Sequence, residues 1–200
     1  PGHKFRALMG GIHMTLAVVT SRALDGLTAP EVRVEVHLAN GLPSFTLVGL
    51  ADTEVKEARE RVRAALAESG FAFPHNKRIT VNLAPADLPK ESGRFDLPIA
   101  LGILAASGQI DASRLAGHEF AGELSLSGQL RPVRGALAMA LALQTGTGVT
   151  QQVTPTLVLP PGSAEEAALV PGTRVVRARH LLDVVARFRP TGAGTATDAP

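Results

Sequence analysis

Hydrophobic and polar residues alternate in two stretches with the period of a β-strand. VRVEVHL, residues 32–38, places its aliphatic side chains on one face and its polar ones on the other, and RITVNLAP, residues 78–85, does the same. Alternation of this kind is typical of a half-buried strand. The turn dipeptide Asn40-Gly41 and the run LPSFTLVGL follow the first stretch. We therefore predict an antiparallel hairpin over residues 32–50.

A helical period begins after this predicted hairpin. DTEVKEARERVRAALAESG, residues 52–70, starts with Asp52 and Thr53, either of which can cap a helix, and ends at a glycine. Its apolar positions form one stripe, and arginines and glutamates interleave on the rest of the surface. We predict an amphipathic helix whose arginine series is a solvated face. This series is Arg59, Arg61 and Arg63.

The run LPIALGILAAS, residues 97–107, is apolar nearly all round. A helix without a polar face is expected in the interior, between other elements. Asp96 precedes it and is a plausible N-cap, because a short carboxylate accepts hydrogen bonds from the free amides of a first helical turn. We expect this helix to form the centre of the core.

The C-terminal half alternates short strands with helices. A strand, a turn at Ser127-Gly128, a returning strand and an apolar helix over residues 135–144 are predicted first. A strand, a short helix, a strand and a last helix follow, up to residue 188. Strands that come first as hairpins and later alternate with helices indicate an α+β fold, a mixed sheet with packed helices.

Composition limits the class of protein. The 200 residues are 45% hydrophobic and 19% charged, with no cysteine, tryptophan or tyrosine and a formal charge of +2. These values are typical of a globular domain with an aliphatic core, and they exclude a disulfide framework. No run of about 20 apolar residues exists, so we expect no membrane partner, and the missing cysteines are compatible with a cytoplasmic location.

The two ends of the chain differ from the middle. Residues 1–13, PGHKFRALMGGIH, have no clear period and precede Met14, so we interpret them as an expression remnant. The tail TGAGTATDAP follows Pro190 and has the composition of a flexible linker. One domain over residues 14–189, with a disordered linker over residues 190–200, is the expected organisation.

Four motifs in this order carry a family resemblance. They are HLANGLPSFTLVGL, VKEARERVRAAL, ITVNLAPADLPKESGRFDLPIALGILAASGQI and GELSLSGQLRPVRGAL. Together they resemble the N-terminal region of the ComM/YifB family, magnesium-chelatase-like AAA+ ATPases. The resemblance implies a domain like the proteolytic domain of Lon, with the ribosomal protein S5 domain 2-like fold, placed ahead of an AAA+ motor.

The same resemblance implies that the Lon active site is degenerate here. Lon carries its nucleophilic serine in a PKDGPSAG-type loop and its lysine after a GxxxPxGG-type turn. Matched to those motifs, PKESGRFD puts Arg94 at the serine position, and LRPVRGAL puts Leu137 at the lysine position. Neither side chain can replace a Ser-Lys dyad. A weaker alternative is a shifted dyad of Ser92 and Lys90, although a serine in a turn before a helix usually makes local hydrogen bonds.

Nucleotide and metal chemistry are not expected within this chain. It contains no GxxxxGK[ST] string, so it should hydrolyse no ATP, and ATP with magnesium is expected only in the missing motor. The histidines lack paired ligand spacing, so no metal site is expected.

The parent family is implicated in DNA branch migration during natural transformation, which implies a homo-oligomer, a hexameric ring, and single-stranded or branched DNA as partners. Within this domain the candidate phosphate contacts are Lys77, Arg78, Lys90 and Arg94. Their alternative role is as solvated strand ends for the first two, and for Arg94 as an ion-pair partner of Asp96 or Glu91. A pure oligomerisation module is also compatible with the sequence.

Overall fold

A computed structural model of the chain describes residues 15–49, 51–90, 93–145 and 154–190. The predicted start at Met14 and the predicted linker after Pro190 concern residues outside these ranges, so both stay predictions.

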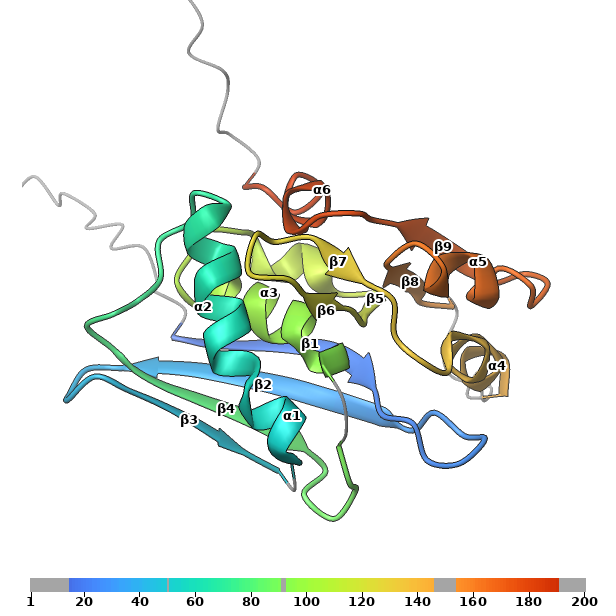
Figure 1. Cartoon of the computed structure of the whole chain (residues 1–200), viewed down its shortest axis with the longest axis horizontal. Helices are drawn as coiled ribbons and strands as arrows, with labels where there is room; N and C mark the ends of the chain where they lie inside the picture. Colours follow the sequence, from blue (N-terminus) through green and yellow to red (C-terminus); the bar gives the residue numbers. More distant parts are fainter. Residues whose placement is uncertain (1–14, 50, 91–92, 146–153, 191–200) are drawn as a thin grey trace, which may run out of the picture.

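The described residues begin with three consecutive strands, and helices and strands are interspersed after them (Figure 1). The strands are β1 (Leu16–Arg22), β2 (Glu31–Ala39), β3 (Ser44–Val48), β4 (Arg78–Ala84), β5 (His118–Phe120), β6 (Glu123–Leu124), β7 (Leu130–Arg131), β8 (Thr156–Leu159) and β9 (Arg174–Arg177). The helices are α1 (Thr53–Lys56), α2 (Ala58–Glu68), α3 (Asp96–Ala106), α4 (Ala136–Thr145), α5 (Ser163–Ala167) and α6 (Leu181–Val185), with short 3-10 turns η1 (Gly93–Phe95) and η2 (Ala112–Leu115).

Within the described residues, seven strands form one mixed sheet in the order β3-β4-β2-β1-β5-β8-β9, and β6 pairs with β7 separately. Strands β1, β2 and β4 are antiparallel to their neighbours in this group, whereas β5, β8 and β9 are parallel. The two halves meet at β1 and β5. There Arg22 holds the carboxylate of Glu119 with two hydrogen bonds, of 2.6 and 2.9 Å. The predicted α+β class, a mixed sheet with helices packed against it, is confirmed.

The predicted hairpin is wrong in its pairing. Strands β2 and β3 form where expected, but β4 lies between them, antiparallel to β2 and parallel to β3. Four connecting residues, 40–43, can cross this gap because two strand spacings are only about 10 Å. Strand β4 buries every second side chain, whereas none of the five residues of β3 is fully buried. The more apolar strand therefore takes the inner position and β3 the edge.

Helix α3 is the centre of the core, as its sequence predicts. All eleven of its residues are buried, and it packs on β1 and β2 with α2 against its other side (Figure 1). Gly102 allows a close approach to the sheet, because a Cβ there would lie 2.4 Å from a methyl carbon of Val36. In the described chain no helix covers the opposite face of β1, β2, β3 and β4 (Figure 1).

The predicted helix over residues 52–70 is present as two pieces. Asp52 caps the first, since its Oδ1 accepts from the amide of Val55 at 2.8 Å. A turn at Glu57 separates α1 from α2. The strands and helices predicted for the C-terminal half are observed, including the turn at Gly128, whose φ of 88° suits glycine. None of the described helices is long and apolar enough to cross a membrane.

Candidate functional site

The segment from Lys90 to Asp96 connects the strand β4 region to the buried helix α3. The carbonyl of Lys90 accepts from the amide of Asp52 at 3.1 Å, which ties the segment to the start of α1. Turn η1 then leads directly into α3. Glu91 and Ser92 lie outside the described residues.

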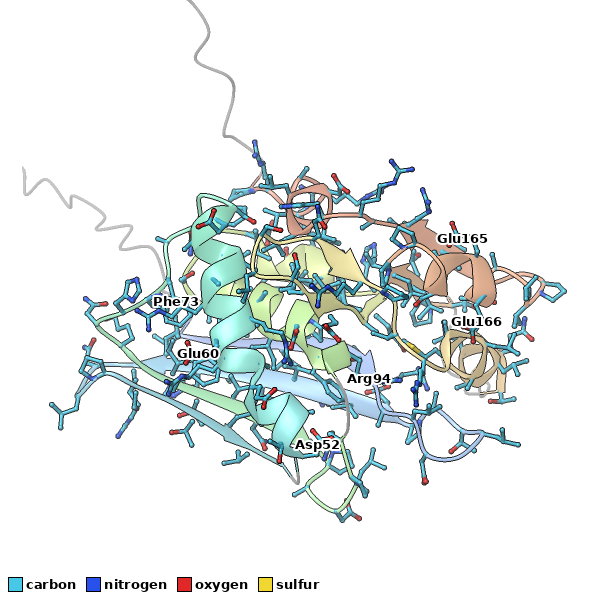
Figure 2. All side chains as sticks on the ribbon, in the orientation of Figure 1. Asp52, Glu60, Phe73, Arg94, Glu165 and Glu166 are labelled. Carbon is cyan, nitrogen blue, oxygen red and sulfur yellow. The ribbon has the colours of Figure 1, made fainter. Side chains whose placement is uncertain are left out.

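Arg94, at the position that matches the Lon serine, is 2% exposed. Its guanidinium donates to the carbonyl of Arg22 at 3.3 Å and to the carbonyl of Arg134 at 2.5 Å. Arg22 ends β1, and Arg134 precedes α4, so Arg94 joins three parts of the chain that are distant in sequence (Figure 2). A buried guanidinium engaged in this way is poorly placed to reach a phosphate. The geometry therefore disfavours the nucleic-acid contact predicted for Arg94.

Leu137 matches the Lon lysine position and lies in the first turn of α4. Its amide donates to a carboxylate oxygen of Glu166 at 3.0 Å. Because Arg94 contacts Arg134, only three residues before Leu137, the two segments that match the Lon active site lie side by side. One provides a guanidinium and the other an aliphatic side chain, and neither group is a nucleophile or a base.

Lys90 is fully buried and donates from Nζ to the carbonyl of Pro85. Burial lowers the pKa of this amine, and the charge of Asp87 opposes the shift in part. The enclosed position disfavours the phosphate contact predicted for Lys90. The alternative Ser92-Lys90 dyad stays a prediction, because Ser92 is outside the described residues.

Asp96 does not cap α3, contrary to prediction. Its carboxylate accepts from Arg61 Nε at 2.6 Å, from Arg61 Nη2 at 3.1 Å and from the amide of Leu124 at 3.1 Å. Arg94 was the predicted ion-pair partner of Asp96 or Glu91. Arg61 was predicted to belong to a solvated helix face. The expected pair of Arg94 with Asp96 and the solvated role of Arg61 are both corrected, because α2 packs on α3 and brings Arg61 onto a fully buried carboxylate. The alternative pair of Arg94 with Glu91 stays a prediction, because Glu91 lies outside the described residues. Burial raises the pKa of Asp96 to about 6 even though Arg61 stabilises the charged form.

Lys77 and Arg78 lie at the other end of β4 from Lys90. Seven strand residues separate the two ends, which corresponds to about 20 Å, so the four predicted cations do not form one surface. Arg78 is exposed at the start of β4, whereas Lys77 precedes the strand and donates to Asn40 Oδ1 at 2.6 Å. Arg78 is exposed and Lys77 is half-buried, whereas Lys90 and Arg94 are buried, so only the first two can reach a phosphate.

Comparison with known proteins agrees with the motifs. Residues 34–157 match the family model described as subunit ChlI of Mg-chelatase. The chain is 55% identical over 172 residues to the competence protein ComM of Haemophilus influenzae and 47% identical over 174 residues to the uncharacterized protein YifB of Escherichia coli. It belongs to the ComM/YifB family.

Both of these ComM/YifB relatives are matched over 86% of this chain, which covers 32% and 33% of their own lengths. The YifB protein of Salmonella typhimurium is 56% identical over 137 residues, 68% of this chain and 27% of that protein. The chain therefore spans about a third of the length of the family members it matches. Activities of the whole ComM/YifB protein are accordingly proposals for this chain.

Two features of this ComM/YifB chain were not predicted. One is the pair between Arg61 and Asp96, whose residues are far apart in sequence. The other is the position of Arg59 and Arg63, which lie beside the loop that carries Lys77. The i,i+4 spacing of the two arginines indicates a common side of the helix, but not what faces them. In the described residues no three histidine, aspartate or glutamate side chains are grouped as metal ligands would be.

Proposed function

We propose that the chain is a non-catalytic, Lon-like N-terminal domain of a ComM-type AAA+ ATPase, which supports hexamer assembly and guides DNA during branch migration in natural transformation. Membership of the ComM/YifB family supports the parent class. The proposal that the domain is not catalytic rests on the environment of Arg94. This side chain lies where the Lon serine is expected and is engaged by two backbone carbonyls.

The chemistry of the parent protein is assigned to a motor outside this chain. The 200 residues contain no GxxxxGK[ST] string, which the phosphate-binding loop of such motors requires. ATP and magnesium would therefore bind in that motor, in the cytoplasm. The domain itself would supply a rigid sheet and backbone contacts to DNA.

Two cations at the start of β4 are the proposed contacts with DNA. Lys77 and Arg78 lie next to each other at the start of β4, and their side chains are not enclosed by the core. Contacts of this kind go to phosphates and fix the position of a strand without reading its sequence. Their affinity should fall steeply with salt, because each neutralised phosphate releases counterions.

Fluorescence anisotropy with labelled single-stranded DNA, at about 50 and 200 mM salt, tests the proposal together with sedimentation of the same sample. We expect salt-dependent binding and a concentration-dependent oligomer. Oligomers that bind no DNA even at low salt would leave only an assembly module. Absence of both would contradict the proposal.

The peptidase alternative is tested in the same preparation with casein. We expect no hydrolysis. Turnover by the wild type that is lost in Ser92→Ala would replace the proposed function with a residual Ser-Lys peptidase.

A further inference from the structure

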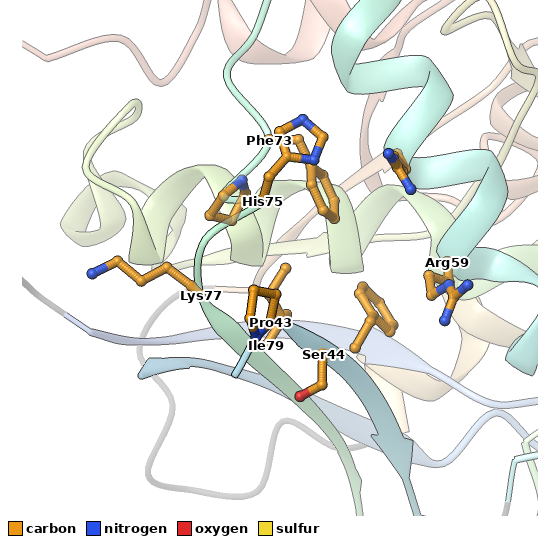
Figure 3. Close-up of a pocket in the computed structure, with 10 residues that line it drawn as sticks. Pro43, Ser44, Arg59, Phe73, His75, Lys77 and Ile79 are labelled. Carbon is orange, nitrogen blue, oxygen red and sulfur yellow. The ribbon is translucent and has the colours of Figure 1, made fainter. Parts of the chain in front are cut away.

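A pocket of about 260 Å³ lies between α2, the loop that precedes β4 and the start of β3 (Figure 3). It combines aromatic side chains with cationic ones. The residues that matter for its chemistry are Phe45, Phe73, Arg59, Arg63, His75 and Lys77. All of the residues that line it belong to the described part of the chain, and none of these is an aspartate or glutamate.

The apolar part of the pocket is held by the core. Phe45 on β3 and Phe73 in the loop are both partly buried and pack against the main hydrophobic cluster. The ring of Phe73 also contacts that of His75, with 5.2 Å between ring centroids. These contacts hold part of each ring in place while leaving part exposed to the pocket. A planar apolar group could therefore stack there at little cost in ordering.

The cationic part comes from two sides. Arg59 and Arg63 are exposed on successive turns of α2, and Lys77 lies across the pocket from Arg59 (Figure 3). Arg59 is paired with Glu60 at 2.8 Å, but both side chains are more than half exposed, so this pair is weak and exchangeable. Lys77 donates to the neutral amide of Asn40, which leaves its charge uncompensated by that contact. The pocket is thus a positive site with an aromatic wall.

We propose that this pocket binds one nucleotide unit of a single-stranded nucleic acid, with the base against Phe73 and the phosphate beside Arg59 and Arg63. Its volume is below the range of about 300–1,000 Å³ of sites for drug-sized molecules, so one unit fits better than a larger ligand. A base in a duplex has both faces stacked and is not available to an aromatic ring, which selects a single strand. The inference rests on the proposed DNA role and assigns it a site.

The test titrates the whole protein chain into a labelled oligothymidylate of about twenty nucleotides and measures its fluorescence anisotropy at several salt concentrations. Arg59→Gln/Arg63→Gln should weaken binding at least tenfold at low salt and reduce the salt slope by about 0.7, because both arginines contact the one phosphate of the bound nucleotide unit. Phe73→Leu should weaken binding about tenfold and leave the slope unchanged, because it removes a stacking surface and no charge. Arg33→Gln is the control, since Arg33 is an exposed cation on the uncovered face of β2.

The outcomes of this experiment distinguish a failure of the proposed pocket from a failure of the proposed DNA role. Wild-type binding that both pocket variants retain at the level of Arg33→Gln overturns the pocket and leaves the proposed DNA role intact. No wild-type binding at low salt overturns both. Variants with the melting temperature of the wild type exclude unfolding as the cause of weakened binding.

Competition identifies the ligand. Unlabelled oligothymidylate should displace the probe, whereas polyglutamate of equal charge and free thymidine monophosphate should do so at least tenfold less well. Equal displacement by polyglutamate would mean that the pocket binds acidic peptide, and equal displacement by the mononucleotide would mean that it binds a free nucleotide. Either result overturns the assignment to a strand.

Discussion

Helix α2 separates two groups of basic side chains that have opposite environments. The inward-facing group is Arg61, which is partly buried, and Arg94, which is buried, and each guanidinium is held by fixed oxygen acceptors. The exposed group, Arg59 and Arg63, faces the pocket beside Phe73 and is open to solvent. Arg61 stands only two residues from each member of the exposed group. The difference shows that the orientation of one helix decides whether an arginine stabilises the fold or is available to a ligand.

The largest effect on stability is expected for Arg94. Arg94→Met should lower the free energy of unfolding by about 3–4 kcal/mol, because the carbonyls of Arg22 and Arg134 lose a charged donor in a buried region. Urea denaturation measures the change. Arg33→Met, which removes an exposed arginine, should change stability by less than about 0.5 kcal/mol. Equal effects of the two substitutions would contradict the structural role of Arg94.

Two arginines of α2 itself, Arg61 and Arg63, give the most direct test of the difference between the two groups. Arg61→Met should destabilise the fold by about 2–3 kcal/mol near pH 8, since it leaves the buried carboxylate of Asp96 without its cation. Arg63→Met, one half-turn away, should cost no more than about 0.5 kcal/mol. In the DNA titration the order should reverse, with Arg63→Met weakening binding. A similar loss of stability in both variants would remove the distinction between the two groups.

A smaller, pH-dependent effect follows from Asp96. Its folded pKa of about 6 lies above the ordinary value of 3.8, so the folded state takes up a proton at higher pH than the unfolded chain does. The resulting stabilisation is fully present below about pH 4 and is lost as the pH rises through about 6. Relative to Asp96→Asn, the wild type should gain about 1 kcal/mol between pH 7.5 and pH 5.

Urea titrations of the two proteins over this range provide the measurement. Parallel stability curves for wild type and Asp96→Asn would mean that the carboxylate titrates at its ordinary pKa despite its burial. A gain in the stability of the wild type relative to Asp96→Asn on raising the pH would mean that pairing with Arg61 outweighs the cost of burial.

Local patterns predicted most of the elements. Alternation predicted β2 and β4, and the absence of a polar face predicted that α3 is buried, because both depend on which side chains must leave water. The motif order predicted the family. Strand β1 was not predicted, because Leu16 and Val18 are apolar on its exposed face and the sequence therefore does not show the alternation of burial.

By itself, the sequence determined most of the elements, the α+β class and the family, because period and motif are properties of neighbouring residues. Only the tertiary structure decided that β4 lies between β2 and β3, that Asp96 takes Arg61 as its partner, and that Arg59, Arg63 and Lys77 surround one pocket. Alternation says which face of a strand is buried but not which strand lies beside it. Pairing and convergence depend on the summed packing of segments that are distant in the chain, which a local pattern does not contain.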